Sequence, residues 1–373
     1  MKFTLKNTQD QRALFAAIGS KDRNESAQAM EAYAAFIAPV AQEVLMQAST
    51  ASAIYRTVQF NEDDSPSIPL DLYFDEGTEF VQTWSQELPG GLGTSHVEGL
   101  KEMKISTYEL YSAVSFNKKY ARKSRLNVLE KATERMINEL LVKQERNAWV
   151  PVLNIAANGN IAGKQNTFRA GTATVFGLDD LNKMITRSRR INQSFANGTP
   201  SNYQYKGLTN LFVSPEVKEQ VRAFVYQPMN TRNGATTTSG ATSIALPDNV
   251  REQIYRSAGA QSVFDIEITE LNELGVNAKY NTLFDTIAGN TTYYKADGTS
   301  GGAVFAATDE LVVGIDASRD AYIRAVVLGS DNSEITVFPD DQFVARQDKT
   351  GFYATLQEGR VAVDARASVN LIL

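Results

Sequence analysis

The sequence predicts an α+β protein that carries an extended two-stranded arm and one long helix. Three observations predict this class. Apolar residues at helical spacing come first, alternating residues follow on both sides of a glycine-rich segment at 89–94, and strand patterns close the chain. A helix pattern of 26 residues, at 124–149, separates the arm from a mixed α/β region.

The first fifty residues are expected to form a helix that Asn24 or Ser26 caps. Pro39 should kink or divide this helix because proline cannot donate the backbone hydrogen bond. The gaps of three and four residues place an apolar stripe on one face. Two interpretations are open: the stripe packs on the subunit's own core, or it contacts a neighbouring subunit. The stripe comprises Met30, Tyr33, Ile37 and Val40.

The arm is predicted over residues 53–119. Alternating apolar residues run from Ile68 to Phe74 on the outgoing side and from Tyr108 to Phe116 on the return side. An isolated two-stranded ribbon is marginally stable in water, so a partner chain is expected to cover it. The residues expected to make this inter-subunit contact lie near the tip of the arm and are Trp84, Leu88, Leu92 and Val97.

Beyond the long helix, which Pro151 is expected to stop or kink, the spacing predicts helices at 178–193, 214–225 and 248–257. The second helix has a capping residue, Ser214, followed by Pro215 at its first position. Residues 228–249 are rich in Thr, Ser, Gly and Asn and predict an exposed loop. Strands are expected at 311–315, 321–328, 334–338, 352–356, 360–364 and 369–373.

Composition excludes several classes of enzyme. The 373 residues include no cysteine and one histidine, so disulfides, thiolate metal sites and histidine-based triads are not expected. The net charge of −6 argues against a grip on nucleic acid by bulk positive charge. No apolar run reaches the length of about 20 residues that a membrane span requires, and no signal peptide is expected, so we expect a cytosolic product.

Three local patterns carry little chemistry. Residues 159–164 resemble a phosphate-binding loop, but one residue is missing and Gln165 stands where a Ser or Thr would contact magnesium. The acidic pairs and triplet are explained by helix starts and turns. A basic run before the long helix has two interpretations. It is a solvated stretch, or it is a surface that pairs with an acidic patch on another subunit or touches packaged nucleic acid. The run includes Lys118, Lys119, Arg122 and Lys123.

The order of these parts resembles the major capsid protein of tailed bacteriophages, which has the Hong Kong 97-type fold. Four segments are similar to sequence in such capsids: 211–217, 250–254, 270–275 and the closing stretch 352–364. The resemblance covers nearly the whole chain. It implies an N-terminal arm at 1–52, an E-loop with its P-domain base at 53–119, a P-domain with the spine helix at 120–164, an A-domain at 165–335, and P-domain return strands with the C-terminal strand at 336–373.

The resemblance implies a subunit that assembles as hexamers and pentamers into an icosahedral shell. The expected partners are copies of itself, a separate scaffolding protein, a portal protein and packaged double-stranded DNA that is bound without sequence specificity; a decoration protein is a further option. The expected location is the virion capsid, assembled in the cytoplasm of a bacterial host. We expect no catalytic residues, no cofactor, no metal, no membrane contact and an uncleaved N-terminus.

Two other functions remain open from the sequence. An encapsulin-type nanocompartment shell has the same fold but carries enzyme cargo in place of DNA, and the long arm favours the phage head over it. An enzyme that uses only carboxylates is the remote alternative. No pair of acidic residues stands out from turn and cap positions, which argues against it.

Overall fold

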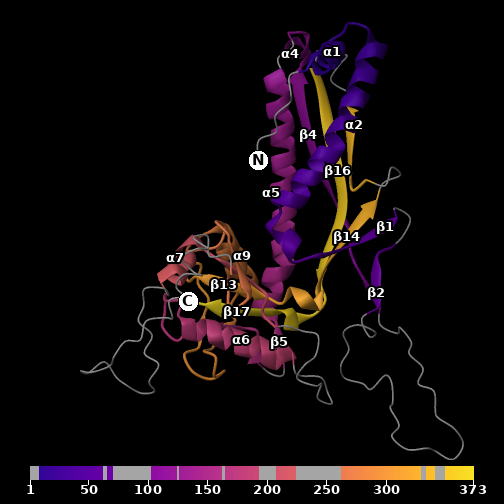
Figure 1. Cartoon of the computed structure of the whole chain (residues 1–373). Helices are drawn as coiled ribbons and strands as arrows, with labels where there is room; N and C mark the ends of the chain where they lie inside the picture. The colour runs from indigo at the N-terminus through magenta and orange to yellow at the C-terminus, as the bar shows by residue number, and fades with distance from the viewer. Residues whose placement is uncertain are drawn as a thin grey trace, which may run out of the picture. The chain divides into compact units, whose positions relative to one another are not determined.

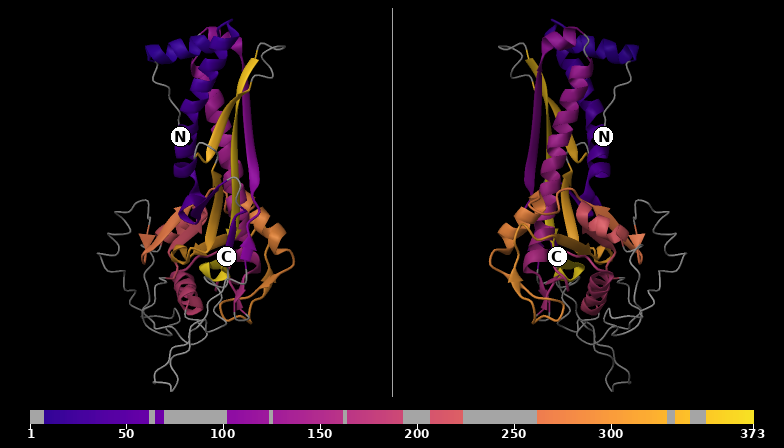
Figure 2. Two further views of the ribbon diagram at one scale, coloured as in Figure 1. Left: turned by 90° about the vertical axis from the view of Figure 1, so that its right-hand side faces the viewer. Right: turned by 90° about the vertical axis from the view of Figure 1, so that its left-hand side faces the viewer.

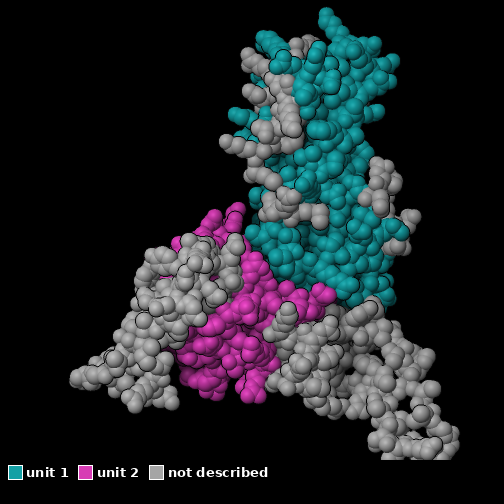
Figure 3. All heavy atoms as spheres, viewed as in Figure 1, with its two compact units in different colours: residues 1–73, 99–149, 322–361 teal, residues 74–98, 150–321, 362–373 magenta. Residues whose placement is uncertain are grey.

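The computed structural model describes residues 8–61, 65–69, 102–123, 126–161, 164–192, 207–223, 262–328, 333–340 and 349–373 (Figure 1). The chain forms two compact units, which Figure 3 distinguishes by colour. Unit 1 takes residues 1–73, 99–149 and 322–361. Unit 2 takes residues 74–98, 150–321 and 362–373.

Unit 1 is built on a five-stranded sheet. Its strands follow the order β1 (Arg56–Asn61), β14 (Tyr322–Leu328), β16 (Lys349–Ala362) and β15 (Ile335–Asp340), and β4 (Tyr108–Asn117) also pairs with β16. The strand β16 is antiparallel to both β15 and β4, whereas β1 runs parallel to β14. The longest strand of the sheet, β16, therefore holds most of it together.

The helices of unit 1 lie on one side of β4 and β16 (Figure 2). Two of them, α1 (Gln9–Ile18) and α2 (Arg23–Ala48), form the N-terminal arm, and a short helix, α4 (Lys118–Arg122), follows β4. A single turn, η1 (Thr50–Ala53), leads into β1. The long helix α5 spans Leu126–Asn158 and passes from unit 1 into unit 2 along the chain.

The N-terminal boundary of α2 differs from the prediction. Asp22 caps this helix, because its Oδ1 accepts a hydrogen bond of 3.0 Å from the backbone N–H of Asn24. Ser26, a predicted cap, lies inside the helix and donates its hydroxyl to the carbonyl oxygen of Ile18 at 2.9 Å. The helix also continues through Pro39 without a break.

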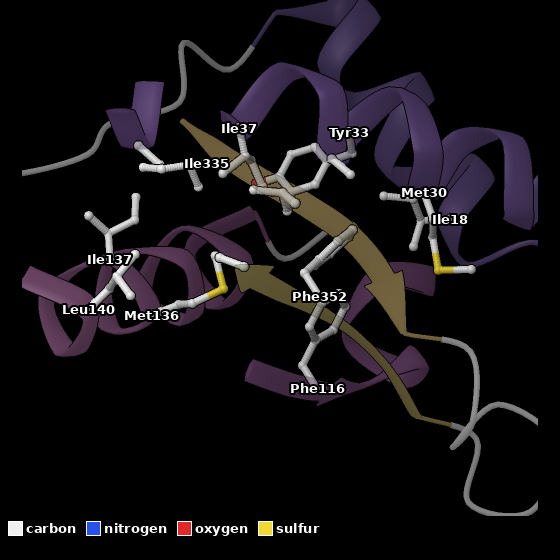
Figure 4. Close-up of a cluster of buried hydrophobic side chains, with 14 of the residues drawn as sticks. Ile18, Met30, Tyr33, Ile37, Phe116, Met136, Ile137, Leu140, Ile335 and Phe352 are labelled. Atoms are coloured by element: carbon white, nitrogen blue, oxygen red, sulfur yellow. The ribbon is translucent and has the colours of Figure 1, made fainter. Parts of the chain in front are cut away.

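The hydrophobic core of unit 1 lies between these helices and one face of the sheet. Alternate residues of β4 and β16, such as Phe116 and Phe352, point inward, and their rings stack at a centroid distance of 6.2 Å. Tyr33 of α2 packs on Phe352 with centroids 5.3 Å apart. Figure 4 shows α2 and α5 side chains meeting these rings, including Ile37 and Met136.

Unit 2 contains a six-stranded mixed sheet. Its order is β7 (Thr167–Arg169), β17 (Ser368–Ile372), β13 (Leu311–Ile315), β8 (Asn210–Val213), β10 (Ile266–Glu270) and β9 (Ser262–Val263). Every residue of β8, β13 and β17 is buried. A sheet whose central strands are buried on both faces needs near-continuous apolar runs, which explains sequences such as Leu211–Val213.

The described part of unit 2 also contains the helices α6 (Leu178–Asn192), α7 (Pro215–Ala223) and α9 (Lys279–Ala288). The predicted cap of α7 is confirmed, because Ser214 Oγ accepts a hydrogen bond of 3.1 Å from the backbone N–H of Val217. Short elements complete the chain: β2 (Ser67–Pro69), β3 (Glu102–Lys104), β5 (Asn160–Ile161), β6 (Lys164–Gln165), β11 (Thr292–Tyr293), β12 (Ala303–Val304), η2 (Ala317–Arg319) and η3 (Ala365–Ala367).

The structure confirms the predicted α+β class and corrects several details. The strand β4, expected to pair within the arm, pairs with β16 of the body sheet, while β2 and β3 pair with each other at the arm's base. The two strands predicted at 352–356 and 360–364 form one strand, β16. The helix α9 was not predicted. The helix predicted at 248–257 and the loop at 228–249 lie outside the described residues.

The unit boundaries also differ from the predicted domains. Residues 322–335 were assigned to the A-domain, but β14 lies in the sheet of unit 1. The C-terminal strand β17, which was predicted separately from the P-domain return strands, lies inside the sheet of unit 2 between β7 and β13.

We predict that Ile37→Ala destabilises the subunit by about 2–5 kcal/mol, because it leaves a cavity in a packed core. Ile37 is 0% exposed. Its neighbour Phe36, which is 46% exposed, provides the control, and Phe36→Ala should change the free energy of unfolding by less than about 0.5 kcal/mol. Urea unfolding of the purified chain measures both values, and equal losses for the two variants would contradict this packing.

Candidate inter-subunit surfaces

The candidate functional residues of this chain are those on surfaces that another copy of the chain could cover. Among the described residues, no group of three or more acidic or histidine side chains could hold a metal ion. None of the helices in the described part of the chain is long and apolar enough to cross a membrane. The predicted contact residues are therefore compared one group at a time with their places in the structure.

Three of the four predicted contact residues of the N-terminal stripe lie in the core of their own unit. Met30, Tyr33 and Ile37 are at most 4% exposed and belong to the core of their own unit, where they face β16 and α5. Val40 is half-buried. The burial of Tyr33 also raises the pKa of its hydroxyl to about 12. Of the two interpretations, packing on the subunit's own core is correct, because these side chains have no free surface to offer a partner.

The tip of the arm lies outside the described residues, so the contacts predicted for Trp84, Leu88, Leu92 and Val97 stay predictions. The base of the arm is described. There β2 and β3 pair in antiparallel register, with Ile68 opposite Met103, and Ser67 Oγ donates a hydrogen bond to the Glu102 carboxylate. The chain therefore leaves and re-enters the body at one place.

The basic run before α5 divides into buried and exposed residues. Lys118 is 6% exposed, and its Nζ lies 3.3 Å from Ser26 Oγ of the same subunit, so its side chain is not available to a partner. Lys119 and Lys123 are exposed. Arg122 lies on α4 between them. Charge pairing stays a prediction for Lys119, Arg122 and Lys123, and the burial of Lys118 argues against it at that residue.

An aromatic patch on the outer face of the five-stranded sheet was missed by the sequence analysis. Tyr111 of β4 is 68% exposed and Phe338 of β15 is 42% exposed. The ring of Phe338 stacks on Tyr353 of β16 with centroids 5.2 Å apart. Exposed aromatic residues that gather on one face are typical of interaction surfaces. Alternation along β4 contained the signal, because the face opposite Leu110 and Phe116 carries Tyr111.

A buried ion cluster in unit 1 was also missed. Glu358 of β16 is fully buried, and its carboxylate accepts hydrogen bonds from Arg324 Nε at 2.8 Å and Arg360 Nε at 3.1 Å. Tyr108 of β4 donates to it at 2.9 Å, and Gln144 of α5 donates at 3.1 Å. These five residues come from β4, α5, β14 and β16. The cluster thus fixes four elements to one buried carboxylate.

Two further contacts support the arginines of this cluster. Glu334 Oε2 accepts a hydrogen bond of 3.3 Å from Arg324 Nη1. The guanidinium of Arg360 lies 5.0 Å from the centre of the Tyr55 ring, and Tyr55 donates its hydroxyl to the carbonyl oxygen of Ala148 at 2.6 Å. Burial of Glu358 alone would raise the pKa of its carboxyl, but Arg360 and Arg324 outweigh it and hold that pKa below its ordinary value.

Comparison with known proteins finds relatives only among solved structures. No family model matches the chain, and no curated protein matches it. One similar structure is described as the capsid of the cyanophage P-SCSP1u, with 13% identity, a TM-score of 0.47 and coverage of 85% of this chain and 86% of that one. Another is the capsid of an empty GTA particle, with 13% identity, a TM-score of 0.48 and coverage of 87% and 89%. A third is the head of the Helicobacter pylori bacteriophage KHP40, with 10% identity, a TM-score of 0.46 and coverage of 87% and 90%.

We predict that Glu358→Gln destabilises unit 1 by about 3–5 kcal/mol, because removing the charge takes the carboxylate partner from the buried Arg360 and leaves Arg324 with Glu334 alone. The matched control is Glu31→Gln, since Glu31 is exposed on α2, and it should change stability by less than about 0.5 kcal/mol. Chemical denaturation followed by circular dichroism measures both. A loss no larger than that of the control would show that the cluster contributes little to the fold.

The same cluster predicts how stability depends on pH. The folded-state pKa of Glu358 lies below its ordinary value of 4.5, so its contribution is present above pH 4.5 and is lost as the pH falls through the folded-state pKa. The stability difference between the wild type and Glu358→Gln should therefore shrink below pH 4.5. Melting temperatures of both proteins from about pH 7 to about pH 3 test this, and a difference that stays constant would contradict it.

Proposed function

We propose that this protein is a major capsid protein of a tailed bacteriophage, which assembles as hexamers and pentamers into an icosahedral shell around double-stranded DNA. One observation carries the proposal: the order of the parts. Two N-terminal helices, the base of a ribbon at residues 67–104, the 33-residue helix α5 and a mixed-sheet unit follow one another, and strands then return to both units. This is the order that the resemblance in the sequence implies.

The exposed surfaces of unit 1 are consistent with a shell subunit. In a shell made of one kind of chain, an apolar surface is covered by another copy of that chain. The patch of Tyr111, Tyr353 and Phe338 and the arm that leaves the body beyond Pro69 are two such surfaces. We infer that both contact neighbouring copies. Lys119 and Lys123 are further candidates for contact with an acidic surface of a neighbour.

The proposal includes the partners that such a shell uses: a separate scaffolding protein, a portal protein and, in some heads, a decoration protein. It places the protein in the virion, with assembly in the host cytoplasm. The encapsulin-type shell is the second candidate, since it has the same fold. The two differ in their contents, which are packaged DNA in a phage head and an enzyme cargo in an encapsulin.

Electron microscopy of the full chain, expressed together with its neighbouring genes, tests the proposal. Closed shells with hexameric and pentameric capsomers support a capsid, and nuclease-protected DNA inside them separates the phage head from the encapsulin. A protein that stays a discrete monomer or dimer, with and without the neighbouring gene products, would overturn the shell function.

We predict that replacing residues 88–99 with a short turn leaves the subunit folded but prevents regular assembly. The body of unit 1 has its own core, whereas each apolar side chain at the tip contributes about 1.5–3 kcal/mol when a neighbour buries it. The measurement combines thermal unfolding with microscopy of the assembly products.

A matched variant that shortens residues 231–245 controls for loop length and should still assemble. Normal, stable shells from the variant without residues 88–99 would show that the arm does not join subunits. Loss of the folded subunit would show that the arm belongs to the core.

A further inference from the structure

A pocket of about 790 Å³ lies within unit 2, and the function proposed above does not use it. Its walls are α6, the β5–β6 hairpin and the segment 294–299 that follows β11. Five cationic side chains and two carboxylates line it, an excess of three positive charges in a chain whose net charge is −6. The cations are Lys164, Lys183, Arg187, Arg190 and Lys295.

Three of these cations form a row on α6. Lys183, Arg187 and Arg190 are separated by four and three residues, so they lie on one face of the helix. Successive positions along the row are about 5 Å apart, because the helix rises 1.5 Å per residue. Lys164 reaches the pocket from β6 and Lys295 from the loop after β11. A ligand in the pocket would therefore meet positive charge from three segments.

No residue in the described part of the chain neutralises the charge at the centre of the row. Among the described residues, no carboxylate forms a salt bridge with Arg187, Arg190 or Lys164. Arg187 Nη2 donates to the carbonyl oxygen of Gln165 at 3.1 Å, but its buried Nε has no hydrogen-bond partner. Partial burial also lowers the pKa of Arg187. A buried donor without a partner is costly, so a ligand that accepts from it would gain affinity.

The two carboxylates of the pocket already have partners in the protein. Asp179 binds Lys183 Nζ at 2.6 Å, so this pair is locally neutral. Asp297 Oδ1 accepts from the backbone N–H groups of Thr299 and Ser300 at 2.9 and 3.0 Å, and Asp297 also accepts from the Ser300 hydroxyl. Lys295 Nζ donates to the carbonyl oxygen of Gly171 at 3.0 Å and carries no paired charge there.

We propose that this pocket binds a phosphate-bearing ligand of nucleotide size, with its phosphates on Arg187, Arg190 and Lys164. Guanidinium groups match phosphate oxygens in geometry and charge. The volume lies in the range of small-molecule sites, which favours a single nucleotide unit over the broad surface of a duplex. Tyr294, which is 39% exposed and lines the pocket, offers a ring on which a base can stack.

The ligand's phosphates have two sources, a free nucleotide or one nucleotide of a single strand, and the experiment separates them. The proposal does not depend on the shell function, because binding is measured on the unassembled full chain. Isothermal titration calorimetry at low salt uses four probes: ATP without metal, sodium tripolyphosphate, a single-stranded DNA 12-mer and a DNA duplex of the same length.

Two variants of neighbouring arginines provide the matched pair. Arg187→Gln combined with Arg190→Gln should weaken binding of ATP and tripolyphosphate about tenfold or more, because each removes a charge-assisted hydrogen bond. Arg189→Gln removes the same charge from an exposed position of α6 outside the pocket, and it should change affinity less than about twofold. If the double variant does not fold, Lys164→Gln serves in its place, since Lys164 is exposed.

The remaining arms define the ligand and the outcomes. Tyr294→Leu should weaken ATP binding and leave the affinity for tripolyphosphate unchanged. If the single-stranded 12-mer displaces ATP, the source of the phosphates is a strand. If the 12-mer does not displace ATP, the source is a free nucleotide. The absence of ATP binding at millimolar concentration, or equal losses in Arg189→Gln and the double variant, would overturn the proposal. A glutamate-rich peptide that displaces ATP at equal concentration would overturn it in favour of an acidic segment of a second copy.

Discussion

The buried carboxylate of Glu358 is the constraint on which unit 1 depends. A single fully buried charge must be matched by donors, and here they come from β4, α5, β14 and β16 itself. Apolar packing alone tolerates small slips of one element against another. The carboxylate of Glu358 needs all four of its donors, so it does not tolerate such slips: each slip would leave a donor or an acceptor without a partner. The four donors are Arg324, Arg360, Tyr108 and Gln144. The cluster therefore selects one register for the sheet and one position of the helix on it.

The residues that form the core of unit 1 are distinct from those that stay exposed on its sheet, and only the exposed ones are available for contact with another chain. The apolar stripe of α2 stabilises its own unit, since Tyr33 and Ile37 are buried in the core. Among the described residues, the other face of the sheet keeps Tyr111 and Phe338 exposed. The buried cluster of unit 1 does not include these two side chains, so its packing does not depend on them.

Local patterns in the sequence were sufficient to predict elements whose signal lies within their own residues. Examples are α6, which has one apolar and one charged face, and α7, which has Ser214 and Pro215 at its start. Patterns failed where distant contacts decide. The helix α5 continues past Pro151 because one face of its last turns is buried, with Leu153, Ala156 and Ala157 at most 3% exposed. Tyr293 also donates its hydroxyl to the Ala157 carbonyl at 3.0 Å. Two strands were expected at 352–356 and 360–364, yet Gly359 between them lies within β16, where a Cβ would come within 2.8 Å of Ser106 O. Neither the ion cluster nor the basic pocket is visible from spacing, because their residues come from distant segments.

The position of β17 has a consequence for the timing of biosynthesis. Asn370 pairs with Thr167, so the central part of this sheet waits for about 200 further residues to be translated, which takes about 10–40 s at bacterial rates. The strands of unit 1 at 322–362 emerge during that interval. Neither unit is complete on a ribosome that has reached only residue 320. Both units therefore reach their folded form late in translation, because each contains strands from residues 322–373.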